Sequence, residues 1–343
     1  MKTTHPLYRI ILMAWIMMVL SQLTSAQKIH LLDSGNRVSL RGLSVVSKKV
    51  FWVSGTKGTI GITLNGGQHI QWTTVNGYED RDFRDIEAFD ERTALIMAID
   101  TPAVILKTSD GGKSWRKVFE DNRSGMFLDA MYFNKNHDGI VAGDPVDGKF
   151  FLAATKDGGE SWSVIKASEC PVADSGEALF AASGSNIISN KKKIFFVSGG
   201  ITSHFIHGNH KIKLPLLQGK SSAGANAIDI AEDGRMIMVG GDFSADTISA
   251  GNCSITDDAG KTFLSPVQSP YGYKSSISYI GSKTWICCGT SGVDISTDHG
   301  MNWKHLSDQR FHIVKKATKG NKIILAGNNG KVGEMTLNLY LKY

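Results

Sequence analysis

Short runs of apolar, β-branched and aromatic residues recur along the whole chain, separated by turns rich in glycine, asparagine and aspartate. Examples are KVFWVSG (49–55), TALIMAID (93–100), RMIMVGGD (235–242) and NKIILAG (321–327). Runs of this length bounded by turn residues predict β-strands. The strands fall into units that each hold an inner strand, a second strand ending near glycine, a third strand leading into a tight turn, and a short outer strand.

The tight turn repeats one motif. Thr108–Trp115, Thr155–Trp162, Thr256–Phe263 and Ser296–Trp303 all read Ser/Thr-x-Asp-x-Gly-x-polar-aromatic, and Thr63–Trp72 is a degenerate copy with asparagine at the aspartate position. The steps between Asn65, Asp110, Asp157, Asp258 and Asp298 are 45, 47, 101 and 40 residues, and the longest step is about two periods. A period of roughly 40 to 50 residues built on strands predicts an all-β, seven-bladed β-propeller.

The motif itself predicts a structural role. The carboxylates of Asp110, Asp157, Asp258 and Asp298 are placed to accept hydrogen bonds from the amides of their own turns, and glycine supplies the positive φ that the hairpin needs. The closing aromatic residue is large enough to anchor one unit against the next. We therefore interpret these segments as Asp-box hairpins whose anchors are Trp72, Trp115, Trp162 and Trp303.

Two units depart from the pattern. In the fourth unit the inner strand is expected within 177–187, and a two-residue turn at Gly208–Asn209 replaces the Asp box. This turn places His207 opposite His210. The pair is either a weak candidate metal site or part of a plain exposed hairpin. The seventh unit lacks a final strand, while Lys28–Leu32 lacks a partner. We expect the N-terminal strand to complete the last blade and close the ring.

The N-terminus has the features of a signal peptide, residues 1–26. Lys2 and Arg9 precede the apolar run Ile10–Leu20, and Thr24 and Ala26 suit a cleavage site after Ala26. The run is too short for a stable membrane span, although an uncleaved anchor is the alternative. We therefore expect an exported protein, periplasmic or secreted, that has no integral membrane segment after cleavage and consists of one propeller domain, residues 27–343.

Charge argues against one class of partner, and cysteine content argues against a fold held together by disulfides. Removing the signal peptide takes away two of the 38 basic residues, which leaves 36 − 32 = +4, and the positive charge is scattered. With no basic stripe carrying interleaved aromatic residues, nucleic acid is not an expected partner. The four cysteines, among them the neighbours Cys287 and Cys288, are too few for a disulfide scaffold, and buried free thiols are expected at that pair.

Propellers bind ligands at one mouth of the central channel, where loops precede the inner strands. Aligning the apolar cores of the inner strands places Asp85, Asp129, Glu177, Asn226 and Ser276 at a common depth. Two opposed carboxylates, for which Asp129 and Glu177 are the candidates, would suit the acid and base of glycoside hydrolysis. No nucleotide, metalloprotease or serine-hydrolase motif is present, so no cofactor is predicted. The candidate binding residues are Arg84, Asp85, Glu87, Asp129, Asp144, Asp174, Glu177 and Asn226, with Tyr273 nearby.

Several long segments resemble one family. The runs DFRDIEAF (82–89), ILKTSDGGKSWRKVF (105–119), GIVAGDPVDGKFFLAATKDGGESW (139–162) and ADSGEALFAASGSNI (173–187) are similar to photosystem II stability/assembly factor-like propellers, and more narrowly to exported relatives in non-photosynthetic bacteria, especially Bacteroidetes. The resemblance implies a seven-bladed propeller and a scaffold that binds partner proteins. The chain also shares its boxes with sialidases, but the mature part lacks their Phe/Tyr-Arg-Ile-Pro motif.

Two hypotheses follow. The first is a monomeric, non-catalytic exported scaffold that binds a protein or glycan at the channel mouth, with a role in envelope complex assembly. The second is a glycoside hydrolase, other than a sialidase, that uses opposed carboxylates at the same mouth.

Overall fold

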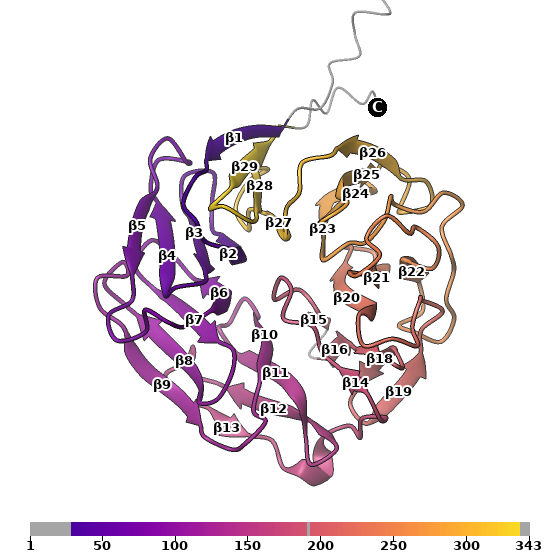
Figure 1. Ribbon diagram of the computed structural model, residues 1–343, viewed down its shortest axis with the longest axis horizontal. Helices are drawn as coiled ribbons and strands as arrows, with labels where there is room; N and C mark the ends of the chain where they lie inside the picture. The colour runs from indigo at the N-terminus through magenta and orange to yellow at the C-terminus, as the bar shows by residue number, and fades with distance from the viewer. Residues whose placement is uncertain (1–28, 191–192, 337–343) are drawn as a thin grey trace, which may run out of the picture.

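The computed structural model describes residues 29–190 and 193–336, which form a ring of seven β-sheets around a central channel (Figure 1). The prediction of a seven-bladed β-propeller is confirmed. The predicted signal peptide lies outside the described residues. Within them the helical structure is one short 3-10 turn, η1 (Ala167–Glu169), and no helix there is long and apolar enough to cross a membrane.

The blades follow one another along the chain. Blade 1 holds β2 (Leu40–Val45), β3 (Phe51–Gly55), β4 (Thr59–Thr63) and β5 (Gln71–Thr74), and blade 2 holds β6 (Phe83–Ala88), β7 (Ala94–Ala98), β8 (Ala103–Thr108) and β9 (Arg116–Asp121). Blade 3 holds β10 (Leu128–Phe133), β11 (Gly139–Val146), β12 (Lys149–Thr155) and β13 (Ser163–Val164). Blade 4 holds β15 (Ile187–Asn190), β16 (Lys193–Val197), β18 (His204–His207) and β19 (His210–Lys213). Blade 5 holds β20 (Ala223–Ile230), β21 (Met236–Asp242) and β22 (Cys253–Thr256), and blade 6 holds β23 (Ser276–Gly281), β24 (Thr284–Gly289), β25 (Gly292–Ser296) and β26 (Lys304–Ser307). Blade 7 holds β27 (Ile313–Lys316), β28 (Ile323–Ala326), β29 (Val332–Met335) and β1 (Ile29–Asp33).

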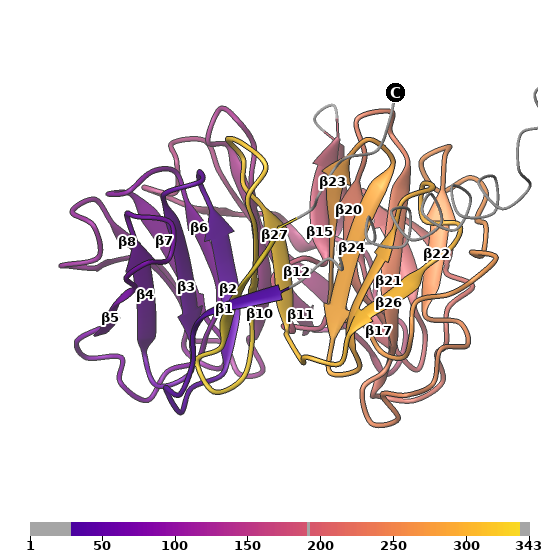
Figure 2. The ribbon, with the colours of Figure 1, turned by 90° about the horizontal axis from the view of Figure 1, so that it is seen from above.

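The N-terminal strand closes the ring, as predicted. β1 pairs antiparallel with β29, with Ile29 opposite Met335, and Figures 1 and 2 place it beside the last blade. The indole nitrogen of Trp72 in blade 1 donates to Asp33 at 2.8 Å. The two ends of the ring are therefore joined by backbone pairing and by a side-chain bond to the first blade.

The fourth unit is built differently from its expected strand pattern. Its inner strand is β15, which begins only at Ile187, while β14 (Glu177–Ala178) and β17 (Gly199–Gly200) pair with each other. β17 also pairs with the inner strand β20 of blade 5, so these two short strands extend the neighbouring blade. The segment between β14 and β15 consequently forms a loop that belongs to none of the seven sheets.

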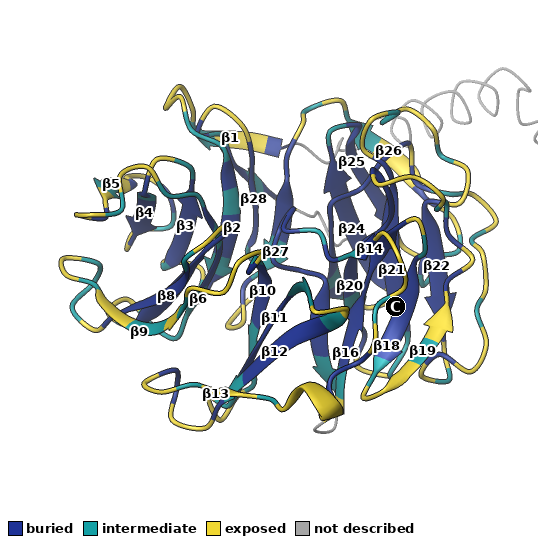
Figure 3. Ribbon diagram, turned by 60° about the horizontal axis from the view of Figure 1, so that its bottom comes forward, coloured by how far each residue is buried: buried dark blue, intermediate teal, exposed yellow. Residues whose placement is uncertain are grey.

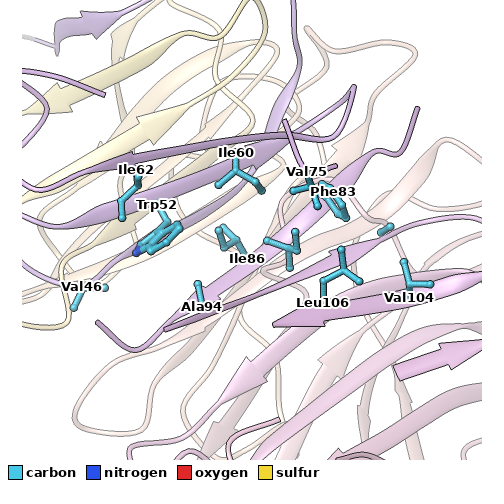
Figure 4. Packing of buried hydrophobic residues seen from close by; sticks show 12 residues of the cluster. Val46, Trp52, Ile60, Ile62, Val75, Phe83, Ile86, Ala94, Val104 and Leu106 are labelled. Carbon is cyan, nitrogen blue, oxygen red and sulfur yellow. The ribbon is translucent and has the colours of Figure 1, made fainter. Parts of the chain in front are cut away.

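The hydrophobic core lies between the blades rather than within one layer. Figure 3 shows that the inner strands are buried, whereas exposure is concentrated in the loops and outer strands. Between blades 1 and 2, Trp52 and Ile60 face Ile86 and Leu106 across the interface (Figure 4). The box residue Trp115 packs edge-on against Trp52, with ring centroids 6.4 Å apart. Six comparable clusters repeat around the ring.

Along the channel, inner strands of neighbouring blades are linked by side chains that accept backbone amide hydrogen bonds. The amide of Ala88 in blade 2 donates to Ser44 in blade 1 at 3.0 Å, and the amide of Met131 in blade 3 donates to Asp85 in blade 2 at 2.7 Å. Tyr279 in blade 6 donates likewise to Asp229 in blade 5 at 2.7 Å. These bonds satisfy backbone groups that no strand pairing reaches.

The repeated turns hold their aspartates in place. Asp110 Oδ1 accepts the amides of Lys113 and Ser114 at 3.0 Å each, and the Ser114 hydroxyl donates to Oδ2 at 2.6 Å. Because these bonds favour the ionised form, the pKa of Asp110 is well below its usual range. The turns at Asp157, Asp258 and Asp298 repeat the arrangement, and at Asn65 the side-chain oxygen accepts the amide of His69.

Candidate functional site

Four inner strands carry a β-bulge at the same level of the ring. The register of each strand with its neighbour skips one residue, and those residues are Arg41, Arg84, Asp129 and Asn226. A bulge re-aims the side chain of the extra residue. All four line one cavity of about 550 Å³ at the end of the channel where the inner strands begin. We call it the mouth cavity.

The alignment predicted from sequence is shifted at blade 2. The residue at the level of Asp129 is Arg84, whereas Asp85 lies one position further along β6 and does not line the mouth cavity. Asp85 accepts the amides of Ile86 and Met131, and burial raises its pKa well above the usual range. Its side chain therefore belongs to the blade-to-blade linkage rather than to the cavity.

The segment Leu179–Asn186, which we call the plug, forms the floor of the mouth cavity. Figure 1 shows this loop, beside β15, reaching into the centre of the ring. Arg41 of blade 1 donates to the Ala182 carbonyl and Arg84 of blade 2 to the Ala181 carbonyl, each at 3.2 Å. From blade 6 the Ser275 carbonyl accepts the hydroxyl of Ser183 at 2.6 Å. The plug is thus held from several sides of the channel.

The N-terminal end of the plug is anchored by a charged network around Glu177. Lys211 Nζ lies 2.6 Å from Glu177 Oε2 and 2.9 Å from Asp174 Oδ1, and His204 Nδ1 lies 2.8 Å from Glu177 Oε1. Burial acts to raise the pKa of Glu177, but the hydrogen bonds from His204, the Asp174 amide, Lys211 and Ser198 outweigh it and lower the pKa to about 2. Neither Asp174 nor Glu177 lines the mouth cavity.

Among residues 29–190 and 193–336, this network also contains three side chains whose ligand atoms are close enough together to hold a metal ion. Ligand atoms of Asp174, Glu177 and His204 lie within 4.8 Å of one another. The Lys211 ammonium already supplies the positive charge that these carboxylates need. The hairpin candidates do pair across the ladder, but His207 Nδ1 lies 3.2 Å from the Ile194 carbonyl and its ring packs on Phe195, while His210 is exposed.

The remaining candidate, Glu87, lies at the opposite end of the inner strand. Burial raises the pKa of Glu87 to about 7, and the Lys315 charge acts in the other direction. Glu87 is near Lys315 and Tyr132 and does not line the mouth cavity. The channel thus has two separate polar ends, with the plug between them.

Acidic groups in the mouth cavity are held in an environment that opposes ionisation. Burial raises the pKa of Asp144 to about 6, against the hydrogen bond that its Oδ1 accepts from the Leu179 amide at 2.8 Å. Burial, and next the charge of Asp144, raise the pKa of Asp129 well above its usual range. Asp129 is 0% exposed, and the charge of Arg84 and hydrogen bonds from the backbone amides of Asp144 and Ala181 act in the other direction without offsetting the burial.

The basic groups face the same space. Burial, and next the charge of Arg84, lower the pKa of Arg41. Arg84 is paired through Nε with Asp82 at 2.7 Å. Burial, and next the Arg41 charge, lower the pKa of His312 to about 4, so this ring is neutral at ordinary pH. The two guanidinium groups are therefore the cations of the cavity at neutral pH.

One side of the cavity is aromatic. Phe180 of the plug packs edge-on against Phe243 at 5.9 Å, and Phe243 packs against Tyr273 at 6.2 Å. The Tyr273 hydroxyl donates to Asn226 at 2.7 Å, and Phe243 is 49% exposed at the rim. The arrangement offers an apolar surface beside charged groups.

Sequence reasoning missed Arg41, His312 and the plug. A signal for Arg41 existed, because Leu40-Arg41-Gly42-Leu43 has the same order of apolar and basic positions as Phe83-Arg84-Asp85-Ile86. The fold and cavity together define a seven-bladed β-propeller with a polar and aromatic cavity at one mouth.

Comparisons with known proteins agree on the fold. No family model matches the chain, and no curated protein matches its sequence. Among solved structures, the chain is similar to YCF48 bound to a D1 peptide, at 17% identity and a TM-score of 0.64 over 92% of this chain and 98% of the other. YCF48 from Cyanidioschyzon merolae gives 14% identity and a TM-score of 0.60 over 90% and 98%. Virginiamycin B lyase from Staphylococcus aureus gives 13% identity and a TM-score of 0.63 over 90% and 99%. At these identities the likeness extends to the fold alone.

Proposed function

We propose that this protein is a non-catalytic scaffold that binds a peptide segment of a partner protein in the mouth cavity. It would belong with the photosystem II assembly factor-like Asp-box propellers, in their exported branch. The predicted signal peptide and the repeated turn motif support that placement. The partner would accordingly be a protein of the cell envelope or the extracellular space.

The observation that carries the proposal is a pair of guanidinium groups, beside an aromatic surface, that still have N–H donors without hydrogen-bond acceptors. An arginine has five N–H donors. Among the described residues, Arg41 donates one hydrogen bond and Arg84 donates two, so four and three donors remain. Carboxylate or carbonyl oxygens of a peptide suit these donors, and apolar side chains suit the Phe180–Phe243 surface. A peptide presents both chemistries along one backbone.

The similarity in fold to a structure of YCF48 with a D1 peptide supports the same class of ligand. The hydrolase hypothesis has less support, because Glu177 is bound to Lys211 and His204 and lies outside the cavity that Asp129 lines. A glycan partner would use the same cavity, so the test below includes glycans.

An array of short peptides from envelope and secreted proteins of the source organism tests the proposal, with a glycan array in parallel. The unmodified protein should bind a defined set of peptides, and Arg41→Gln with Arg84→Gln should reduce binding at least tenfold. Arg92→Gln is the matched control because Arg92 is exposed in the turn at the other end of β6. Binding of glycans alone, or equal binding by the double variant, would refute a peptide-binding mouth.

A further inference from the structure

A second cavity, which we call the seam pocket, lies where the two ends of the ring meet. It has a volume of about 460 Å³ and is lined by residues of β1, of β29 and of the turns that follow β2, β4 and β27. The turns after β2 and β4 are joined by the amide of Gly66, which donates to the Lys49 carbonyl at 2.8 Å. Because these turns follow the ends of the inner strands, the seam pocket lies at the opposite end of the ring from the mouth cavity.

Two lysines line the seam pocket, and one of them is fixed in place. The side chain of Lys322 is 10% exposed, and its Nζ donates to the Gly66 carbonyl at 2.7 Å and to Glu334 Oε2 at 2.9 Å. A Cβ at Gly66 would lie 3.3 Å from this Nζ and 2.9 Å from the Lys48 carbonyl oxygen, so glycine lets the two lysine-bearing turns pack closely. Lys48 is exposed, and its side chain has no hydrogen bond to any described residue.

The degenerate box of blade 1 offers donors at this pocket where the other boxes have a carboxylate. Asn65 Oδ1 accepts the amide of His69 at 3.0 Å, as Asp110 Oδ1 accepts that of Ser114. In the four aspartate boxes, Oδ2 accepts a further bond from the side chain four positions later. In Asn65 an NH2 group takes the place of that oxygen, and it has no acceptor among the described residues. Asparagine therefore keeps the turn, removes a negative charge and adds N–H donors.

The charge around the seam pocket is positive. Of the described residues that line it, Lys48 and Lys322 contribute +2 and Glu334 contributes −1, which leaves 2 − 1 = +1 with His30 counted as neutral. The three turns 46–50, 63–70 and 317–322 contain four lysines and no acidic residue. The corresponding turns of blade 2, 89–93 and 108–115, contain three acidic and two basic residues. The excess of positive charge therefore distinguishes the seam from the neighbouring blade.

We propose that the seam pocket binds a phosphate group, carried either by a lipid headgroup or by a small soluble molecule. Lysine binds phosphate as a point charge, and the side-chain amides of Asn65 and Gln68 can add directed hydrogen bonds. Glu334 is already paired with Lys322, which leaves Lys48 as the lining cation without a counter-charge among the described residues. A phosphate bound between β1, β29 and blade 1 would also help to hold the ring closed. The site is separate from the mouth cavity and requires no peptide ligand there.

Isothermal titration calorimetry of the whole protein with sodium phosphate, at neutral pH and constant ionic strength, tests the site. Binding should saturate, and phosphate should raise the melting temperature because a ligand of the folded state alone stabilises that state. Lys48→Gln removes a cation and Asn65→Asp restores the carboxylate of the box, so each should weaken binding by about fivefold or more. Asn65→Asp reproduces the four aspartate turns and should therefore fold. Lys113→Gln, which changes an exposed lysine in the equivalent turn of blade 2, is the matched control and should bind normally.

Flotation with phosphatidylcholine vesicles, with and without phosphatidic acid, distinguishes the two sources of phosphate. Retention that requires phosphatidic acid and is lost in Lys48→Gln indicates a lipid headgroup, whereas binding of phosphate in solution without retention indicates a soluble ligand. The site would be overturned if no phosphate bound in either assay, if Lys48→Gln and Asn65→Asp bound as the natural protein does, or if Lys113→Gln weakened binding equally. Loss of phosphate binding in Arg41→Gln with Arg84→Gln, but not in Lys48→Gln, would place the anion in the mouth cavity and overturn it too.

Discussion

Replacing Asp144 with asparagine should stabilise the protein at high pH. Asparagine keeps the oxygen that accepts the Leu179 amide hydrogen bond, but it cannot carry the charge that the half-buried site opposes. Burial raises the pKa of Asp144 to about 6, roughly two pH units above the ~3.9 of an unfolded chain. At ~1.36 kcal/mol for each pH unit, the difference corresponds to about 3 kcal/mol, and partial solvent contact reduces it to about 2 to 3 kcal/mol.

The sign follows from which state loses its proton first. Between about pH 4 and pH 6 the unfolded chain ionises at this position while the folded one stays protonated, so the free energy of unfolding of the natural protein falls as pH rises. Asp144→Asn removes this loss, and it also removes a charge that raises the pKa of Asp129. Relative to the natural protein, the variant should therefore gain about 2 to 3 kcal/mol on going from pH 4 to pH 8.

Urea denaturation of both proteins at the two pH values, followed by tryptophan fluorescence, measures the difference. Glu232→Gln, a loss of the same charge at an exposed site, should show a change below about 0.5 kcal/mol. A stability difference between Asp144→Asn and the natural protein that is equal at pH 4 and pH 8, or larger at pH 4, would refute the reasoning.

Three further substitutions test the plug, its anchor and the core. Gly184→Val should displace the plug and lower the melting temperature, because a Cβ at Gly184 would lie 2.3 Å from the carboxyl carbon of Asp85; an unchanged melting curve would contradict the packing. Lys211→Met should raise the pKa of Glu177 from about 2, because one of the hydrogen bonds that lowers this pKa is lost. NMR titration of the Glu177 carboxyl carbon measures the change. An unshifted titration would mean that the contact between Lys211 and Glu177 is absent in solution. Trp52→Ala should cost about 3 to 5 kcal/mol in chemical denaturation, because the side chain is 0% exposed between two blades; a cost below about 1 kcal/mol would contradict the interface.

The ring and its closure were predictable because both depend on local patterns. Each blade repeats apolar runs and one turn motif, and the missing strand of blade 7 matched the unpartnered run at the N-terminus, as the Ile29–Met335 pairing confirms. The turn motifs recur within tens of residues of one another. The closure joins the two ends of the chain, but it was predictable because a closed ring brings those ends together and each showed its part of the signal locally, a missing strand in one and an unpartnered run in the other.

The mouth cavity could be predicted only in part, because its details depend on single-residue shifts and long-range contacts. One bulge residue exchanges the roles of Arg84 and Asp85, and an alignment that assumes regular strand alternation does not account for it. The plug, with the sequence Leu-Phe-Ala-Ala-Ser-Gly-Ser-Asn at 179–186, has no periodicity of its own. Its place is set by contacts such as that from Arg41 to Ala182, 141 residues apart.

Site-specific photo-crosslinking tests most directly whether a partner protein binds at the mouth. The photoreactive residue p-benzoylphenylalanine is placed at the rim in place of Phe243, 49% exposed, or as a control on the outer strand β13 in place of Val164, 50% exposed. We predict that the rim position alone forms a defined crosslinked adduct with one envelope or secreted protein in the source cells. We also predict that Arg41→Gln with Arg84→Gln abolishes the adduct. Equal crosslinking from both positions, or a rim adduct that survives the double substitution, would contradict the account.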